Sequence, residues 1–234
     1  MSLHQPHGCQ FFDPDSDYTL AWKRLPHLAQ AGTLCFITWR TADSLPAEAI
    51  ARLAEHRRTL LERHQIKPDL HWKASLAQLP AAVRAQVHWA LFYAWDKELD
   101  LAMGACLLRR PELSRLVLES LLHFDNERYF LTDAVVMPNH VHLIAAFRDE
   151  DMQLTQCTSW KRFTGTRINR LIWSEQSDPR EIETRPKTEF WQVDQFDHLV
   201  RGPEDFAKYQ KYIAMNPAKA KLKEGQYAYY TKEL

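Results

Sequence analysis

Turn and strand signals meet in the run Met137-Pro138-Asn139-His140-Val141-His142-Leu143-Ile144-Ala145-Ala146-Phe147. Pro138 and Asn139 favour a turn, and the apolar residues after them favour a buried strand. Because successive side chains of a strand point to opposite faces of its sheet, His140 and His142 would lie side by side, about 6–7 Å apart at Cα. Two imidazoles on one face can both reach a single divalent cation. The pair therefore predicts part of a metal site; unrelated packing or surface histidines are the alternative unless the chain supplies a third ligand.

The overall composition is that of a globular protein. The chain has 234 residues, of which 45% are hydrophobic and 12% aromatic, and its formal net charge is zero. This content indicates a packed core rather than a disordered segment. No apolar run reaches the length of about 18 residues that a membrane helix needs, and residues 1–17 lack the apolar core of a signal peptide. With four cysteines that form no C-x-x-C motif, we expect a cytoplasmic protein with reduced thiols and no membrane partner.

Local patterns predict a mixed chain of the α+β class. Strands are expected at 33–40, 129–137, 141–147 and 190–194, and helices from Pro46 onward and at 80–94, 111–124, 154–173 and 203–216. In the helix 154–173, we assign Phe163 and Leu171 to the core face together with Trp160, Thr164 and Ile168. The order β-α-β-β-α-β-α predicts a ferredoxin-like arrangement, an antiparallel sheet with helices on one face.

The predicted elements also suggest a domain organisation. Residues 1–30 would form an N-terminal extension, 31–225 a single domain, and 226–234 a C-terminal tail. Residues from about 65 to 110 are less regular and interrupt the pattern after the first strand. We therefore expect a helical insertion at that point of the single domain.

The helix predicted at 203–216 holds a tyrosine and an amide one turn apart. Tyr212 and Asn216 share one side of the helix, beside an apolar stripe with Phe206 and Tyr209 that forms its core face. This spacing would aim both polar side chains at the sheet. The alternative is an ordinary amphipathic helix that ends with Asn216 as a cap, because a proline disfavours the helical conformation of the residue before it.

Basic residues are concentrated in the helix expected at 154–173. Between residues 155 and 173 there is no acidic residue. The basic residues there are Lys161, Arg162, Arg167 and Arg170. Because single-stranded nucleic acid is held in basic grooves, we interpret these four as DNA-binding residues. A solvated basic face is the alternative.

Several motifs together resemble one family. The run MPNHVH at 137–142 is followed by FWQ at 190–192, FDHLVR at 196–201 and YIAMNPAKAKL at 212–222. This combination closely resembles the REP-associated tyrosine transposases of bacteria, which are single-tyrosine transposases of the HUH nuclease superfamily. The resemblance covers most of the chain from about residue 30 to residue 225.

The resemblance implies an activity and a site. His140, Val141 and His142 match the His-hydrophobic-His motif, Tyr212 matches the nucleophile, and Asn216 matches the third metal ligand. By this likeness the chain is expected to be an HUH transposase, a DNA nickase and strand transferase. It would use Mg²⁺ or Mn²⁺ and a 5′-phosphotyrosine intermediate to cleave single-stranded DNA at REP-like palindromic hairpins. We expect a monomer that acts at the bacterial nucleoid, with a dimer as the alternative.

Two other functions remain open on the sequence alone. One is a DNA hairpin-binding, regulatory protein derived from a transposase, which binds without cleaving. The other is a metal hydrolase of small phosphodiesters, which would need neither Tyr212 nor the basic helix. The presence of Tyr212, His140, His142 and Asn216 together favours the transposase.

Overall fold

The computed structural model describes residues 8–22, 26–69, 71–176 and 189–232. The chain divides into two compact units, one formed by Asp43–Ala105 and the other by Met1–Ala42 with Cys106–Leu234. The larger unit contains, in chain order, β1 (Thr19–Trp22), β2 (Pro26–Ala29), β3 (Leu34–Arg40), the short 3-10 helix η1 (Leu107–Arg109), α4 (Pro111–Leu122), β4 (Tyr129–Val136), β5 (His140–Phe147), α5 (Met152–Gln176), β6 (Phe196–Leu199), α7 (Pro203–Lys219) and β7 (Ala228–Thr231). None of the described helices is long and apolar enough to cross a membrane.

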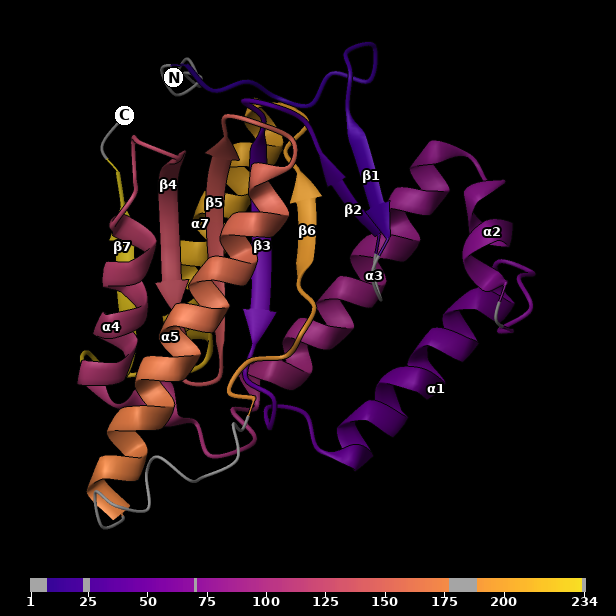
Figure 1. Cartoon of the computed structure of the whole chain (residues 1–234). Coiled ribbons are helices and arrows are strands. Elements are labelled where there is room, and N and C mark those ends of the chain that lie inside the picture. Colours follow the sequence, from indigo (N-terminus) through magenta and orange to yellow (C-terminus); the bar gives the residue numbers. More distant parts are fainter. Residues whose placement is uncertain (1–7, 23–25, 70, 177–188, 233–234) are drawn as a thin grey trace. The chain divides into compact units, whose positions relative to one another are not determined.

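The larger unit is built on an antiparallel sheet in which the strands follow the order β6-β3-β5-β4-β7 (Figure 1). Its first four strands, with α4 before β4 and α5 between β5 and β6, have the connectivity of a ferredoxin-like fold. The α+β fold class predicted from the sequence is confirmed. The fifth strand, β7, adds to β4 at the sheet edge and lies in the segment expected to be a tail. A separate two-stranded sheet pairs β1 with β2.

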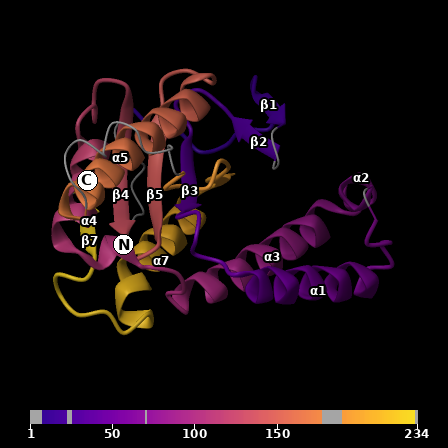
Figure 2. The same ribbon diagram turned by 60° about the horizontal axis from the view of Figure 1, so that its bottom comes forward.

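Helices pack against both faces of the sheet. Side chains that alternate along β3 point to one face or the other and contact different helices. Trp39 stacks on Trp160 of α5, with ring centroids 5.8 Å apart. Phe36 points the other way and stacks on Tyr209 of α7 at 4.5 Å. The views in Figures 1 and 2 agree that α5 and α7 lie on opposite sides of the sheet. The two helices of the ferredoxin-like core, α4 and α5, share one face, and α7 packs on the other.

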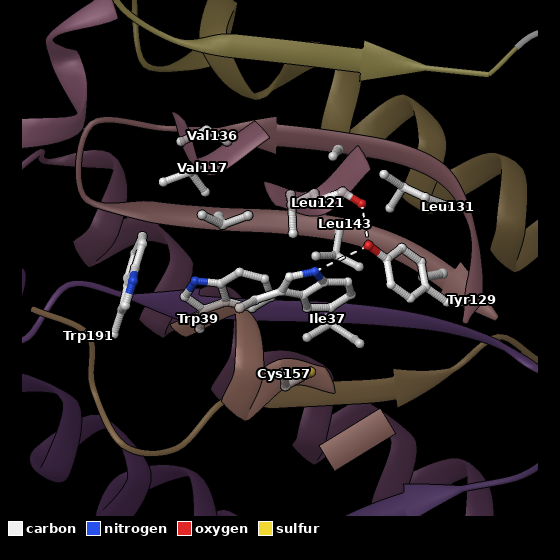
Figure 3. Close-up of a cluster of buried hydrophobic side chains, with 14 of the residues drawn as sticks. Ile37, Trp39, Val117, Leu121, Tyr129, Leu131, Val136, Leu143, Cys157 and Trp191 are labelled. Carbon is white, nitrogen blue, oxygen red and sulfur yellow. Dashed lines mark hydrogen bonds between the residues drawn. The ribbon is translucent and has the colours of Figure 1, made fainter. Parts of the chain in front are cut away.

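The face under α4 and α5 carries the main hydrophobic core (Figure 3). Val141 and Leu143 of β5 point into it and are fully buried. The Tyr129 hydroxyl donates to the Leu121 carbonyl at 2.7 Å, and the indole N–H of Trp160 donates to the same hydroxyl at 3.3 Å. These hydrogen bonds satisfy the polar atoms of two buried rings, so the aromatic side chains add apolar area to the core without an unpaired donor.

The strand predicted at 190–194 was wrong. Trp191 makes only an isolated bridge to Thr41, and the strand that pairs with β3 is Phe196–Leu199. The reason is packing: the Trp191 indole donates to Thr164 of α5 at 2.8 Å and lies close above Gly165. The aromatic side chains that suggest a strand at 190–191 therefore pack against helix α5 instead.

Helix α7 does not end before Pro217 as expected. It continues to Lys219, with Pro217 inside the last turn. A proline at this position removes one backbone hydrogen bond near the helix end, where carbonyls already lack helical partners. The amide of Ala220 then closes the helix on the carbonyl of Asn216 at 3.0 Å. Asn216 consequently stays helical, one turn after Tyr212.

Two core assignments in α5 were also wrong. Phe163 is 50% exposed and Leu171 is 40% exposed, whereas Trp160, Thr164 and Ile168 are buried. The helix has apolar residues on more than one side, so periodicity alone does not choose between the two faces. Packing on the sheet selects the side with Trp160.

The smaller unit contains α1 (Ala47–Arg63), α2 (Trp72–Ala77) and α3 (Ala81–Asp100). Helices α1 and α3 pack through Ala49, Leu53 and Leu99, and Leu45, just before α1, joins the same cluster. The helical unit spans Asp43–Ala105, whereas the insertion was expected from about residue 65 to residue 110. The domain limits expected from the sequence stay predictions.

Candidate functional site

The two histidines of β5 lie side by side on the face opposite the main core. Their ring centroids are 4.7 Å apart, and each offers a ligand nitrogen within 4.8 Å of the other. His140 is 1% exposed and His142 is fully buried. The alternation expected for this strand thus puts both imidazoles next to each other, within reach of one cation.

Hydrogen bonds fix the orientation of both imidazole rings. Nδ1 of His142 lies 2.7 Å from Oγ1 of Thr38, and Nδ1 of His140 lies 2.8 Å from Oδ1 of Asn139. The side-chain oxygen of Asn139 accepts, so Nδ1 of His140 is the protonated nitrogen. Nε2 is then the nitrogen that each ring can offer to a metal. A metal-binding histidine commonly has its other nitrogen held in this way.

The sheet register explains the contact to Thr38. Strand β3 pairs with β5 so that Thr38 lies directly opposite His142 and Arg40 opposite His140. Facing side chains of paired strands lie about 4.5–5.5 Å apart at Cβ, which suits a hydrogen bond between threonine and histidine. The sequence analysis did not identify Thr38 or Asn139 as a hydrogen-bond partner of the histidines. Alternation places Thr38 on one side of its strand, but only the pairing register identifies its partner.

Tyr212 of α7 reaches the same face of the sheet. Its ring centroid lies 5.2 Å from that of His142, at 76° between the ring planes, and 5.8 Å from that of Phe36. The Tyr212 hydroxyl oxygen is buried, although the residue as a whole is half-buried. The Lys219 ammonium lies 5.4 Å from the centre of the Tyr212 ring. A phenol, two imidazoles and a cation therefore share one region.

Asn216 follows Tyr212 by one turn and is fully buried. Within the described residues, neither its Oδ1 nor its Nδ2 has a hydrogen-bond partner. A buried amide without partners costs free energy, about 1–3 kcal/mol for each unsatisfied group. The amide oxygen is a suitable ligand for Mg²⁺ or Mn²⁺. The chemistry of His140, His142 and Asn216 thus fits a divalent cation.

The neighbouring Tyr209 differs from Tyr212 in its surroundings. It is 3% exposed and stacks on Phe36, and burial raises the pKa of its phenol well above the ordinary value. Deprotonation of Tyr209 is therefore disfavoured. The structure assigns Tyr209 to packing, as its place on the apolar stripe predicts.

A buried carboxyl group ties α7 to the sheet. Asp133 of β4 accepts hydrogen bonds from Gln210 of α7 at 3.1 Å and from Thr231 of β7 at 2.9 Å. Burial raises the pKa of Asp133, and the hydrogen bonds from Thr231 and Gln210 partly oppose this shift. Because Gln210 lies two residues before Tyr212, this contact helps to fix the position of the tyrosine.

The four basic residues predicted to bind DNA have different surroundings in α5. Arg162, Arg167 and Arg170 are exposed. The Lys161 ammonium instead donates to the Val193 carbonyl at 2.6 Å and to Gln195 at 2.8 Å, which attaches the segment before β6 to α5. Helix α5 packs on the face of the sheet opposite His142, so the basic residues are not brought together with Tyr212.

A second cluster of ionisable groups joins β2 to β6. His27 is buried between two carboxylates: Nε2 lies 2.8 Å from Asp194, and Nδ1 contacts Asp197. Burial lowers the pKa of His27, but the hydrogen bonds to Asp194 and Asp197 outweigh it and raise the pKa to about 9. The imidazole therefore carries a positive charge at neutral pH, and both nitrogens are used as donors.

Comparisons with known proteins give a likeness to a solved structure. No protein-family model and no curated protein matches the sequence. Among solved structures, the chain is similar to that of a REP-associated tyrosine transposase bound to a REP hairpin. The two are 13% identical, with a TM-score of 0.37, over 85% of this chain and 73% of that chain.

Proposed function

We propose that this chain is a metal-dependent endonuclease and strand transferase for single-stranded DNA, with Tyr212 as its nucleophile. The observation that carries the proposal is the approach of Tyr212 to His142, 5.2 Å between ring centroids, on a sheet face that also presents His140. A metal hydrolase of small phosphodiesters would not need a tyrosine at this place. A phenol beside a pair of metal-binding imidazoles is suited to attack on a phosphate held there.

His140, His142 and Asn216 are the residues that would hold the metal. They contribute two neutral imidazoles and one neutral amide, so the ligands add no negative charge to the site. When bound, Mg²⁺ or Mn²⁺ would act as a Lewis acid toward a non-bridging oxygen of the DNA phosphate. Thr38 and Asn139 contact Nδ1 of His142 and of His140, respectively, which leaves Nε2 of each imidazole as the metal-binding nitrogen.

The proposed reaction conserves the phosphodiester bond energy. The Tyr212 hydroxyl oxygen attacks phosphorus and loses its proton, while the bond from phosphorus to the 3′ oxygen breaks and that oxygen leaves as a 3′-hydroxyl. The product is a 5′-phosphotyrosine, a diester like its precursor. Attack by the 3′-hydroxyl of another strand reverses the step and joins two strands without an external energy source. The chemistry therefore suits strand transfer better than hydrolysis.

The proposed DNA target is a REP-like palindromic hairpin with a single-stranded flank, in the bacterial nucleoid. Of the basic residues of α5, Arg162, Arg167 and Arg170 are exposed and would contact such a strand. A monomer is sufficient, because Tyr212 and the His140–His142 pair lie in one chain.

The test is a cleavage reaction on a labelled hairpin with a single-stranded flank. In the presence of Mn²⁺ the protein should form a covalent complex that survives denaturation, and EDTA or Tyr212→Phe should abolish it. Tyr212→Phe should retain hairpin binding. Binding without any covalent complex under these conditions would instead identify a non-cleaving hairpin-binding protein. Cleavage without a covalent complex would identify a hydrolase.

A further inference from the structure

Helix α5 presents an aromatic side chain to solvent among cations. Phe163 is 50% exposed, and the residues three, four and seven positions later are Thr166, Arg167 and Arg170, all exposed. Residues at this spacing are neighbours on a helix surface. We call these four residues the α5 stripe. At a rise of about 1.5 Å per residue the stripe is about 10 Å long.

The charged residues of α5 between positions 155 and 173 are all basic. The guanidinium of Arg167 lies 5.5 Å from the Phe163 ring centre. Within the described part of the chain, neither Arg167 nor Arg170 forms an ion pair, whereas Arg110 binds Glu112 and Glu175. No acidic residue occurs between residues 155 and 173. A partner for this surface should therefore be negatively charged and should offer a flat apolar face to Phe163.

We propose that the α5 stripe binds an unpaired segment of DNA, with Phe163 stacking on a base and Arg167 and Arg170 contacting the phosphates beside it. This inference rests on the proposed function, because it assumes that the protein acts on DNA. Unpaired bases expose their faces and duplex bases do not, so an aromatic platform selects a single strand. Arginine also suits the planar geometry of phosphate contacts.

The stripe and the candidate catalytic site serve different parts of the DNA. Trp160 of α5 packs on Trp39, whereas Tyr212 of α7 contacts His142 on the opposite face of the sheet. Nucleotides on the stripe are therefore separated by the sheet from the phosphate at Tyr212. The stripe recognises a flank that is not cut, so its loss should weaken binding and leave the chemical step unchanged.

The test measures binding of a fluorescent, unstructured oligonucleotide to the full chain in EDTA at several salt concentrations. Phe163→Ala should weaken binding about tenfold without changing the salt dependence, and Phe163→Trp should restore it. Arg167→Gln should lower the slope of log K against log salt by about 0.7, the value for one phosphate of a single strand. Leu171→Ala, which removes exposed apolar area from the same helix without removing a ring, should bind like the unaltered protein.

The inference is overturned if Phe163→Ala binds within twofold of the unaltered protein, or if Leu171→Ala weakens binding equally. It is also overturned if Phe163→Ala lowers the rate of adduct formation at saturating DNA. Phe163 is exposed, so thermal unfolding should match that of the unaltered protein. The two proposals can fail separately. If the unaltered protein forms the adduct and Phe163→Ala binds DNA normally, only the proposal for the α5 stripe is contradicted. Weakened binding by that variant, with no adduct from the unaltered protein, contradicts only the cleavage function.

Discussion

The ring of Tyr212 lies 5.2 Å from the ring of His142, at 76° between their planes. One turn earlier on the same helix, Tyr209 stacks on Phe36 and is almost fully buried. Two tyrosines three positions apart thus differ in their surroundings: one packs, and the other approaches an imidazole pair. The proposed chemistry depends on this difference and on the hydrogen bonds that orient the imidazoles.

Thr38→Val should weaken metal binding without removing a ligand. The substitution keeps the shape of the side chain but removes the oxygen 2.7 Å from Nδ1 of His142. Loss of such an orienting contact typically costs about 10–100-fold in metal affinity or activity. Calorimetric titration with Mn²⁺ measures the change.

Thr132→Val provides the matched control for Thr38→Val. Thr132 is also a buried threonine of the same sheet, and its hydroxyl donates to the Ile144 carbonyl. This variant should lose stability, about 1 kcal/mol for the hydrogen bond, and bind Mn²⁺ normally. Equal metal affinity of the two variants would show that Thr38 does not orient His142 for a metal.

Asn216→Ala should weaken Mn²⁺ binding, and Asn216→Asp should retain or strengthen it. The side chain of Asn216 is fully buried, and its amide atoms have no hydrogen-bond partner among the described residues. A carboxylate keeps the oxygen ligand and adds negative charge, which a divalent cation favours. Electron paramagnetic resonance of bound Mn²⁺ reports both changes. Unchanged affinity of Asn216→Ala would exclude Asn216 as a ligand.

The free energy of unfolding should fall as pH rises from about 6.5 to 9, because of His27. The folded protein raises the pKa of this group from 6.5 to about 9 through Asp194 and Asp197, against the effect of burial. A raised pKa means that the folded state binds the proton more tightly than the unfolded state does. The contribution of protonated His27 to the free energy of unfolding is therefore complete below pH 6.5 and is lost as the pH passes 9.

Denaturant unfolding measures this free energy across the pH range. Comparing the unaltered protein with His27→Gln isolates the contribution of the imidazole. At neutral pH the substitution should cost about 3–5 kcal/mol, since it leaves Asp194 and Asp197 without their cation. The difference between the two proteins should shrink above pH 9. A difference that is constant with pH would mean that His27 is uncharged in the fold.

Tyr129→Phe should destabilise the fold and spare the candidate site. It leaves the Leu121 carbonyl and the Trp160 indole N–H without the hydroxyl they share (Figure 3). The expected loss is about 1–3 kcal/mol, the cost of an unsatisfied buried group. Because Tyr129 lies in the core on the face opposite His142, Mn²⁺ affinity should not change. A loss of affinity comparable to that of Thr38→Val would contradict the separation of the two faces.

Local patterns predicted the parts of the site that depend on one element. The turn at Pro138 and the alternation in β5 predicted that His140 and His142 lie side by side, and helical spacing predicted the stripe with Tyr209. Both depend only on short-range geometry.

Features that depend on distant contacts were not predictable from local pattern. The partner of His142 is Thr38 because of strand register, which the hydrophobic pattern of the whole sheet determines. Trp191 has a strand-like neighbourhood in sequence, yet it packs on Gly165 of α5. Phe163 has an apolar side chain with helical spacing to the core residues, but the sheet meets the other side of α5. In each case tertiary packing overrides the local preference.

The most direct test of the account is to identify the residue that becomes attached to DNA. After reaction with a labelled oligonucleotide and Mn²⁺, trypsin cleaves after Lys208 and Lys211 and so places Tyr209 and Tyr212 in different peptides. Mass spectrometry should find the nucleotide on the peptide that begins with Tyr212, and Tyr212→Phe should form no adduct. A nucleotide on Tyr209 or another residue, or an adduct formed by Tyr212→Phe, would contradict the central claim.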